Sequence, residues 1–401
     1  MNKQIFRLED QLRSGRISRR TFLSRAVGLG LAIPVANALA AACVAPPPGA
    51  APAASGGGAA TTATANKVVW VSPRGTLEVM DDYPLWVASK MGYFEQQNLE
   101  VELQPGPQGG ANIVSLITEK QADCSFPSPG VLAAAIDAGI PAVLGFEMFG
   151  GQVFNFAIPA DSDITSVADL AGKTIAVGSI GWQPIIDPIL AEAGVDIKSV
   201  KYVEAGGQWG QAVDQKQADA ALAWEGLRAQ WLSIGLKVKF LIGSEFSKDP
   251  SNGYVIRSAD LDDATWGDVW TRFFRATAMG LHFGATNPQA AGEITYGQFP
   301  ALKDQMTPDL ALESMRQLAF GYNQFAREGK GYGYSDLANW QSYFDRIFKL
   351  GQVKKEIKVD SAVTNKFVEA ANDFDQAKVE ADAKNYATSD EWKNLKLQGE
   401  I

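Results

Sequence analysis

The sequence of 401 residues predicts an α/β protein with two similar lobes, each a mostly parallel sheet flanked by helices. The first supporting observation is a repeat, because Lys-Gln-Ala-Asp stands at 120–123 and again at 216–219. In both copies a glycine follows the glutamine by 18 positions, at Gly139 and Gly235. The second observation is an alternation of strand-like and helix-like segments from residue 67 to residue 257, which is typical of parallel sheets. Two such halves place a cleft between them.

The first half of the alternation opens with an apolar strand at 68–71, closed by Ser-Pro-Arg-Gly. A helix is expected from Tyr83 to Met91, because Pro84 suits a first helical turn and Gly92 a helix end. Further strands are expected at 99–103, through Ser125 and at 143–147, with helices that reach Lys120 and that start at Pro129.

The second half repeats this order of elements. Strands are expected at 174–177, 200–203, 220–223 and 238–242, and helices at 184–193, before 220 and from Gly226. The chain is expected to cross between lobes at 153–158 and 253–257. Amphipathic helices at 266–283, 309–326 and 336–349 should complete the first lobe and brace the hinge. The predicted organisation is therefore lobe 1 at 67–156, lobe 2 at 157–252 and a return to lobe 1 with C-terminal helices at 253–401.

The N-terminus reads as an export signal. A basic region with Arg19-Arg20 precedes a short apolar run and three alanines, and this order predicts a signal peptide at 1–42 of the twin-arginine kind. Cys43 follows the alanines, as in a bacterial lipoprotein, and its thiol would then carry a lipid anchor. Simple cleavage at an Ala-x-Ala site is the alternative. Residues 43–66 are almost entirely Ala, Pro, Gly, Ser and Thr, which predicts a disordered tether.

Composition excludes several classes of function. The net charge is −9, and it becomes −14 without the basic first 42 residues, so no nucleic-acid partner is expected. Two cysteines and one histidine, His282, are too few for a disulfide framework or a histidine-rich zinc site. No metal and no cofactor are predicted.

Three segments then carry a resemblance to a known family. They are Gly92-Tyr93-Phe94-Glu95 followed by 99–102, Gln121-Ala122-Asp123 with Ser128-Pro129-Gly130, and 169–177. In this order they resemble the periplasmic solute-binding proteins of the nitrate, sulfonate and thiamine-precursor class. The resemblance implies a two-lobed type II periplasmic-binding-protein fold that closes on a small-molecule ligand. It also implies an ABC permease and its ATPase as partners, a place outside the cytoplasmic membrane, and a receptor rather than an enzyme.

The candidate ligand-binding residues follow from the topology, because ligands of open parallel sheets bind beyond the C-terminal ends of strands. From the first lobe the loops offer Ser72, Arg74, Asp82, Tyr83, Phe126, Ser128, Gly151 and Gln152. From the second lobe they offer Ser179, Gly181, Trp182, Gln183, Trp224 and Glu225.

The chemistry of these residues leaves alternatives open. Trp182 or Trp224 could stack on a flat ring, and a buried Glu225 would need an N–H donor from the ligand. Alternatively, the tryptophans pack in the core and Glu225 pairs with Arg228. The favoured ligand is a thiamine-precursor pyrimidine, a flavin or a similar heterocycle, with a sulfonate or nitrate held by Arg74 as the alternative. A pyrimidine-synthesis enzyme of the same fold is disfavoured, because His282 is the single histidine and the cysteines do not cluster.

Overall fold

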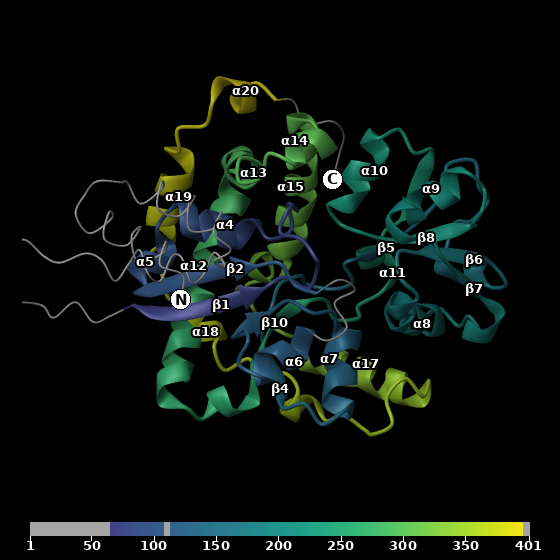
Figure 1. Ribbon diagram of the computed structural model, residues 1–401, viewed down its shortest axis with the longest axis horizontal. Coiled ribbons are helices and arrows are strands. Elements are labelled where there is room, and N and C mark those ends of the chain that lie inside the picture. Colours follow the sequence, from purple (N-terminus) through teal and green to yellow (C-terminus); the bar gives the residue numbers. More distant parts are fainter. Residues whose placement is uncertain (1–64, 108–112, 396–401) are drawn as a thin grey trace, which may run out of the picture. The chain divides into compact units, whose positions relative to one another are not determined.

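The computed structural model describes residues 65–107 and 113–395, coloured by sequence in Figure 1. The predicted signal peptide, Cys43 and the tether up to residue 64 lie outside the described residues. Within those residues, no helix combines the length and the apolar character that crossing a membrane requires.

The first sheet contains five strands in the order β2-β1-β3-β10-β4. Strand β1 (Asn66–Val71) pairs in parallel with β2 (Leu99–Gln104) and with β3 (Cys124–Ser125). Strand β10 (Gly253–Arg257) lies antiparallel between β3 and β4 (Ala142–Glu147). One strand from late in the chain is therefore inserted into an otherwise parallel sheet.

The second sheet repeats the same arrangement in the order β7-β6-β8-β5-β9. Strands β6 (Thr174–Val177), β7 (Lys201–Glu204) and β8 (Ala220–Trp224) run parallel. Strand β5 (Phe154–Pro159) is antiparallel to both β8 and β9 (Val238–Leu241). The two-lobed α/β fold class with mostly parallel sheets is thus confirmed, and β5 and β10 are the antiparallel strand of each lobe.

The structure gives the sequence repeat a physical basis. Lys120 and Lys216 both have a positive φ, 59° and 57°, which ends the preceding helical segment with a left-handed residue. The aspartates three positions later act alike as well. A carboxylate oxygen of Asp123 accepts from the backbone N–H of Val69 at 2.9 Å, and one of Asp219 accepts from that of Thr174 at 2.8 Å. Each copy therefore ties the third parallel strand of its lobe to the first.

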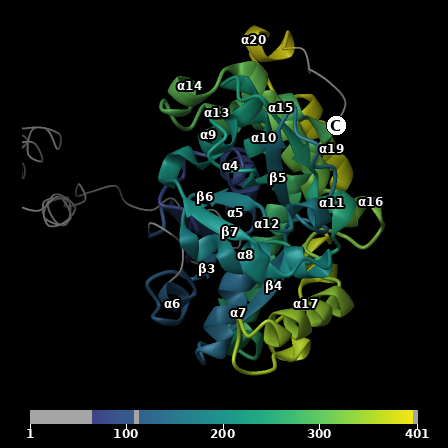
Figure 2. The ribbon, with the colours of Figure 1, turned by 90° about the vertical axis from the view of Figure 1, so that its right-hand side faces the viewer.

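Helices cover both faces of each sheet. The first lobe contributes α4 (Tyr83–Lys90), α5 (Tyr93–Gln96), α6 (Ile113–Thr118) and α7 (Pro129–Asp137), and the second α8 (Gln183–Glu192), α9 (Trp209–Asp214), α10 (Leu227–Ser233) and α11 (Gly243–Phe246). In the second lobe, which faces the viewer in Figure 2, Ile175 and Val177 pack in one core with α8, whereas Ala176 packs in another with α9. This alternation follows from the two-residue period of a strand.

The C-terminal third is mainly helical, as predicted. Its helices are α12 (Ala264–Thr286), α13 (Pro288–Tyr296), α14 (Leu302–Gln305), α15 (Pro308–Tyr322), α16 (Gln324–Arg327), α17 (Leu337–Lys349), α18 (Val368–Ala371), α19 (Gln376–Lys384) and α20 (Asp390–Lys393). The helix expected at 309–326 is interrupted at Asn323, so that α15 and α16 are separate. Helix α12 lies so close to α4 that a Cβ at Gly280 would stand 2.2 Å from the carbonyl oxygen of Pro84.

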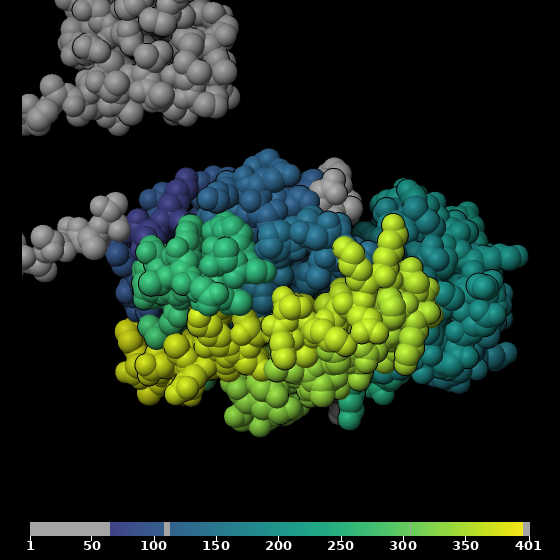
Figure 3. Space-filling view, turned by 90° about the horizontal axis from the view of Figure 1, so that it is seen from below, coloured from purple at the N-terminus to yellow at the C-terminus, as the bar shows by residue number. Residues whose placement is uncertain are grey.

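Two C-terminal helices of the first lobe also contact the second lobe. On α15 the hydroxyl of Ser314 donates to the carbonyl oxygen of Gly226 at 2.9 Å. On α17 the guanidinium of Arg346 lies 3.6 Å from a carboxylate oxygen of Glu192 on α8. Figure 3 shows the residues of α17, in yellow-green, against the second lobe in teal. The lobes are thus in contact through side chains outside the two crossings.

Candidate functional site

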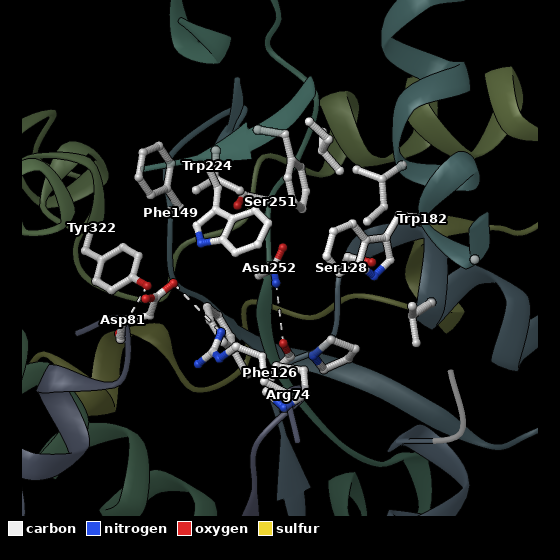
Figure 4. A pocket seen from close by; sticks show the side chains of 18 of the residues that line it. Arg74, Asp81, Phe126, Ser128, Phe149, Trp182, Trp224, Ser251, Asn252 and Tyr322 are labelled. Atoms are coloured by element: carbon white, nitrogen blue, oxygen red, sulfur yellow. Dashed lines mark hydrogen bonds and ion pairs between the residues drawn. The ribbon is translucent and has the colours of Figure 1, made fainter. Parts of the chain in front are cut away.

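A cavity of about 290 Å³, here called the ligand pocket, lies where the loops after the strands of both sheets meet. Its polar residues are Arg74, Asp81, Ser128, Ser251, Asn252 and Tyr322, and its aromatic residues, besides Tyr322, are Phe126, Phe149, Phe154, Trp182 and Trp224. Small and aliphatic residues complete the lining: Pro73, Gly75, Pro127, Val131, Val153, Gly181, Ile185 and Leu222. Figure 4 shows the labelled side chains around the cavity.

The two lobes contribute different chemistry to the ligand pocket. The second lobe and the crossing that leads into it provide Val153, Phe154, Gly181, Trp182, Ile185, Leu222 and Trp224, none of which carries a charge or a hydroxyl. The polar side chains come from the first lobe and from the segment between α11 and β10. A ligand in this pocket therefore meets an apolar wall on one side and a polar edge on the other.

The polar edge is an arginine between two carboxylates. One terminal nitrogen of Arg74 lies 2.7 Å from both carboxylate oxygens of Asp82, whose side chain is 2% exposed. The other terminal nitrogen lies 3.8 Å from Asp81, which is therefore a much weaker partner. The Tyr322 hydroxyl donates to the backbone oxygen of Asp81 at 3.2 Å, as Figure 4 shows. With both carboxyls ionised this group carries a formal net charge of −1.

Burial controls the protonation of this group. Burial raises the pKa of the Asp81 carboxyl to about 6, because Arg74 offsets only part of the lost hydration and Asp82 adds repulsion. Burial opposes the charged form of Arg74, yet Asp82 and Asp81 together raise the pKa of its guanidinium above the ordinary value. Asp81 is thus a weakly partnered acceptor at the edge of the pocket, whereas Asp82 is held by a terminal nitrogen of Arg74.

The aromatic wall is built around perpendicular tryptophans. The rings of Trp182 and Trp224 meet edge to face, with centroids 5.9 Å apart and planes at 81°. Trp209 stacks behind Trp224 at 5.8 Å, and its indole N–H donates to the carbonyl oxygen of Leu222 at 2.7 Å. These contacts fix the orientation of both tryptophan rings that line the pocket, and a fixed aromatic ring is what stacking by a flat ligand requires.

Six of the fourteen residues predicted from the sequence line the ligand pocket: Arg74, Phe126, Ser128, Gly181, Trp182 and Trp224. Two others support Arg74 from outside, since Asp82 holds its guanidinium and the Ser72 hydroxyl accepts from its backbone N–H at 3.1 Å. Tyr83 is fully buried and stacks on Tyr322, with ring centroids 5.8 Å apart.

The remaining predicted residues have local roles. The Ser179 hydroxyl accepts from the N–H of Gly181, Gln183 donates to Asp187, and the Gln152 side chain accepts from the N–H of Phe154. Gly151 lies in the segment between β4 and β5 with φ of 118°.

Glu225 points away from the ligand pocket. Its carboxylate accepts from Asn155 at 3.0 Å and from Arg228 at 2.9 Å, so its hydrogen-bonding need is met within the protein. This agrees with the alternative pairing with Arg228.

Sequence reasoning missed Asp81, Phe149, Ser251, Asn252 and Tyr322. Asp81 adjoins the predicted Asp82 in the same loop, and Phe149 follows the predicted strand at 143–147, so both positions were within reach of the topological rule. Ser251 and Asn252 directly precede β10, and Tyr322 comes from the end of α15. No local pattern marked those three residues. Among residues 65–107 and 113–395, no group of three or more His, Cys, Asp or Glu residues is placed to hold a metal ion.

Comparison with known protein families identifies the family to which the chain belongs. A family model described as NMT1/THI5 like matches residues 80–291, more than half of the chain. The chain belongs to the NMT1/THI5-like family. The match runs from just before α4 to the first half of α13 and includes Asp81 and both pocket tryptophans, whereas Arg74 and Tyr322 lie outside it.

A curated relative and two solved structures agree with this family and with the predicted resemblance. A formylaminopyrimidine-binding protein from Halalkalibacterium halodurans is 24% identical over 227 residues, or 54% of this chain and 68% of the relative. The alkanesulfonate-binding protein of Xanthomonas axonopodis pv. citri, bound to MOPS, superposes with a TM-score of 0.57 at 13% identity over 75% of this chain and 99% of that one. The ligand-binding component of an ABC-type import system from Staphylococcus aureus gives 0.55 at 12% identity over 78% and 100%. The two structures show that this member of the NMT1/THI5-like family has the periplasmic-binding-protein fold.

Proposed function

We propose that this protein is an extracytoplasmic solute-binding lipoprotein of an ABC importer, and that it captures a small nitrogen heterocycle between its lobes. The ligand class includes a thiamine-precursor pyrimidine, a flavin or a similar ring. The observation that carries the proposal is the pairing of perpendicular tryptophans on one lobe with the weakly partnered Asp81 on the other. A flat ring can stack on the former while its N–H groups donate to the latter.

The charge of the polar edge supports a heterocycle over an anion. A sulfonate or nitrate would have to share Arg74 with Asp82, because one terminal nitrogen of Arg74 already contacts both oxygens of Asp82 at 2.7 Å. An anion at this edge would also face Asp81 and a formal net charge of −1. An amine or ring N–H meets the opposite situation, because it gains a charge-assisted hydrogen bond to a desolvated carboxylate.

The size of the ligand pocket favours a compact ring. Its volume of about 290 Å³ lies at the lower end of small-molecule sites, which span roughly 300–1,000 Å³. A single substituted pyrimidine therefore fits better than a three-ring flavin. The formylaminopyrimidine-binding relative supports the same choice.

The proposed mechanism is closure of the lobes about the two crossings. A ring bound to the apolar wall alone lacks a polar partner until the first lobe approaches. Contacts from both lobes then stabilise the closed state. The exported protein would deliver its ligand to a permease and its ATPase, with Cys43 as the proposed lipid attachment.

The test is a thermal-shift screen of the purified protein against pyrimidines, flavins, alkanesulfonates, nitrate and bicarbonate. Stabilisation by ring compounds that disappears in Trp182→Ala supports the proposal. Stabilisation by anions alone, lost in Arg74→Ala, would overturn it in favour of an anion receptor.

A further inference from the structure

A second cavity of about 140 Å³ lies on the other side of the wall of the ligand pocket. We call it the rear cleft; it is lined by Phe149, Glu225, Arg228, Gln317, Phe320 and Gly321, among others. Neighbouring residues face opposite sides of the wall. Trp224 and Tyr322 line the ligand pocket, whereas Glu225 and Gly321, each next to one of them, line the rear cleft.

Among the described residues, Phe149 alone lines both cavities. Its side chain is buried, at 4% exposure, and its ring meets that of Tyr322 edge to face with centroids 5.8 Å apart. We propose that Phe149 is a specificity-determining residue that sets the greatest length of ligand the pocket accepts. This inference rests on the proposed function of the ligand pocket.

The position of the Phe149 ring depends on a glycine of α15. A Cβ at Gly321 would stand 1.9 Å from Cε2 of Phe149, so an alanine there must displace the ring. The backbone after Phe149 continues through Gly150 and Gly151, and Gly151 has a φ of 118° that strongly favours glycine. The wall between the two cavities, here called the partition, thus consists of the Phe149 ring. This ring packs against α15, and two glycines follow it in the chain.

The rear cleft has chemistry suited to a polar chain. Glu225 and Arg228 form an ion pair at 2.9 Å, which compensates their charges. Nε of Arg228 is buried without a hydrogen-bond partner in the described part of the chain. Gln317 adds a side-chain amide whose oxygen accepts from the N–H of Gly226 at 3.3 Å. Hydroxyl or amide groups of a chain that extends from a ring would find donors and acceptors there, whereas an alkyl chain would not.

The experiment compares ligands that share a ring and differ by a hydroxylated chain, measured by calorimetry on the full-length protein. The probe pairs are 1-methylcytosine with 1-(2,3-dihydroxypropyl)cytosine and 1-methylthymine with 1-(2,3-dihydroxypropyl)thymine, so that the methylated compound serves as the bare ring and the N–H groups of the ring are the same within each pair. The wild type is expected to bind the bare ring of a pair more tightly than its chain-bearing partner. In Phe149→Ala the chain-bearing partner should gain at least about tenfold in affinity, while the bare ring gains nothing.

Two further variants distinguish a specific effect on the partition from a general loss of stability or binding. Gly321→Ala pushes the Phe149 ring toward the pocket and should weaken binding of the bare ring, although alanine suits a helix. Phe320→Ala removes an exposed side chain of the rear cleft alone and should leave the preference of the wild type unchanged. Phe149→Leu, which keeps more of the buried volume, serves if the alanine variant does not fold.

The outcomes distinguish the two proposals. If bare rings bind but Phe149→Ala gains no affinity for either chain-bearing partner, the role of Phe149 is wrong and the proposed function stands. If no ring binds any variant, the proposed function fails. A crystal structure of Phe149→Ala then tests the partition without a ligand, because two cavities that remain separate would overturn it.

Discussion

Replacing Asp81 by asparagine should stabilise the ligand-free protein while it weakens ligand binding. The carboxyl has a pKa of about 6 in the folded protein against an ordinary value of 3.8. At pH 7 the group is charged in both states, and folding carries it into a site that disfavours the charge. A difference of about two pKa units corresponds to about 3 kcal/mol at 1.36 kcal/mol per unit, and Asp81→Asn should recover most of it.

The sign can be tested by varying pH. Because the folded pKa lies above the unfolded value, the folded state of the wild type binds more protons between about pH 4 and pH 6. Its stability therefore falls as pH rises through this window, and the Asp81→Asn variant should lack this component. Burial also raises the pKa of Asp249 to about 6 and that of Glu147 to about 7, so the difference between wild type and variant is the quantity to compare.

The assay is thermal unfolding at pH 7 and pH 5. For a body of roughly 330 described residues, about 3 kcal/mol corresponds to a rise in Tm of about 4 °C at pH 7, and the gain should shrink at pH 5. Asp82→Asn is the matched control with the opposite sign, because it removes the partner that holds Arg74 at 2.7 Å. It should destabilise the protein by about 1.5–3 kcal/mol.

Ligand binding completes the argument about Asp81. A ring that donates an N–H to the carboxylate should lose about 1.5–3 kcal/mol in Asp81→Asn, or roughly tenfold to 150-fold in affinity. Its affinity for the wild type should also fall as pH drops below about 6, where the carboxyl becomes protonated. An Asp81→Asn variant that is less stable at pH 7 and binds the ring unchanged would refute the reasoning.

Three more outcomes are expected. Trp182→Ala should weaken ring binding by about 1–3 kcal/mol in calorimetry, whereas Trp266→Ala, which does not line the pocket, should not; equal losses would contradict a stacking role. Arg346→Gln removes an ion pair between lobes and should speed ligand dissociation in stopped-flow fluorescence, while Lys349→Gln on the same helix leaves the rate unchanged. Cys43→Ser should abolish labelling of the protein by a radioactive fatty acid and release it from membranes, and a variant that is still labelled disproves the lipid attachment.

The fold could be predicted from the sequence because local signals repeat in both lobes. The Lys-Gln-Ala-Asp copies mark a left-handed residue and an aspartate that ties two strands, and both requirements are local in the chain. The insertion of β5 and β10 as antiparallel strands was not predicted, since short apolar strands carry no signal for their direction. The interruption between α15 and α16 at Asn323 was not predicted either, because the amphipathic pattern of the sequence continues through it.

The candidate site could be predicted only where it follows strand ends. Arg74, Phe126, Ser128, Gly181, Trp182 and Trp224 lie in loops that the topological rule selects. The rule cannot say which of two adjacent residues turns toward the ligand. Asp82 was therefore selected from the sequence, whereas Asp81 lines the pocket. Tyr322 depends on how α15 packs across the first lobe, which is a tertiary contact between positions more than 240 residues apart.

The sequence predicted a buried carboxylate that needs an N–H donor from the ligand and assigned this role to Glu225. In the structure Asp81 is the better candidate for it. Glu225 is satisfied by Asn155 and Arg228, so a ligand has nothing to offer it. In the described part of the chain Asp81 has the weak contact with Arg74 at 3.8 Å as its ion pair, and it stands on the opposite lobe from Trp182, although both line one pocket. Stacking and hydrogen bonding then act on a ligand together only when the lobes are closed. A ligand that offers a flat face without an N–H, or an N–H without a flat face, engages one lobe alone and gives little stabilisation to the closed state.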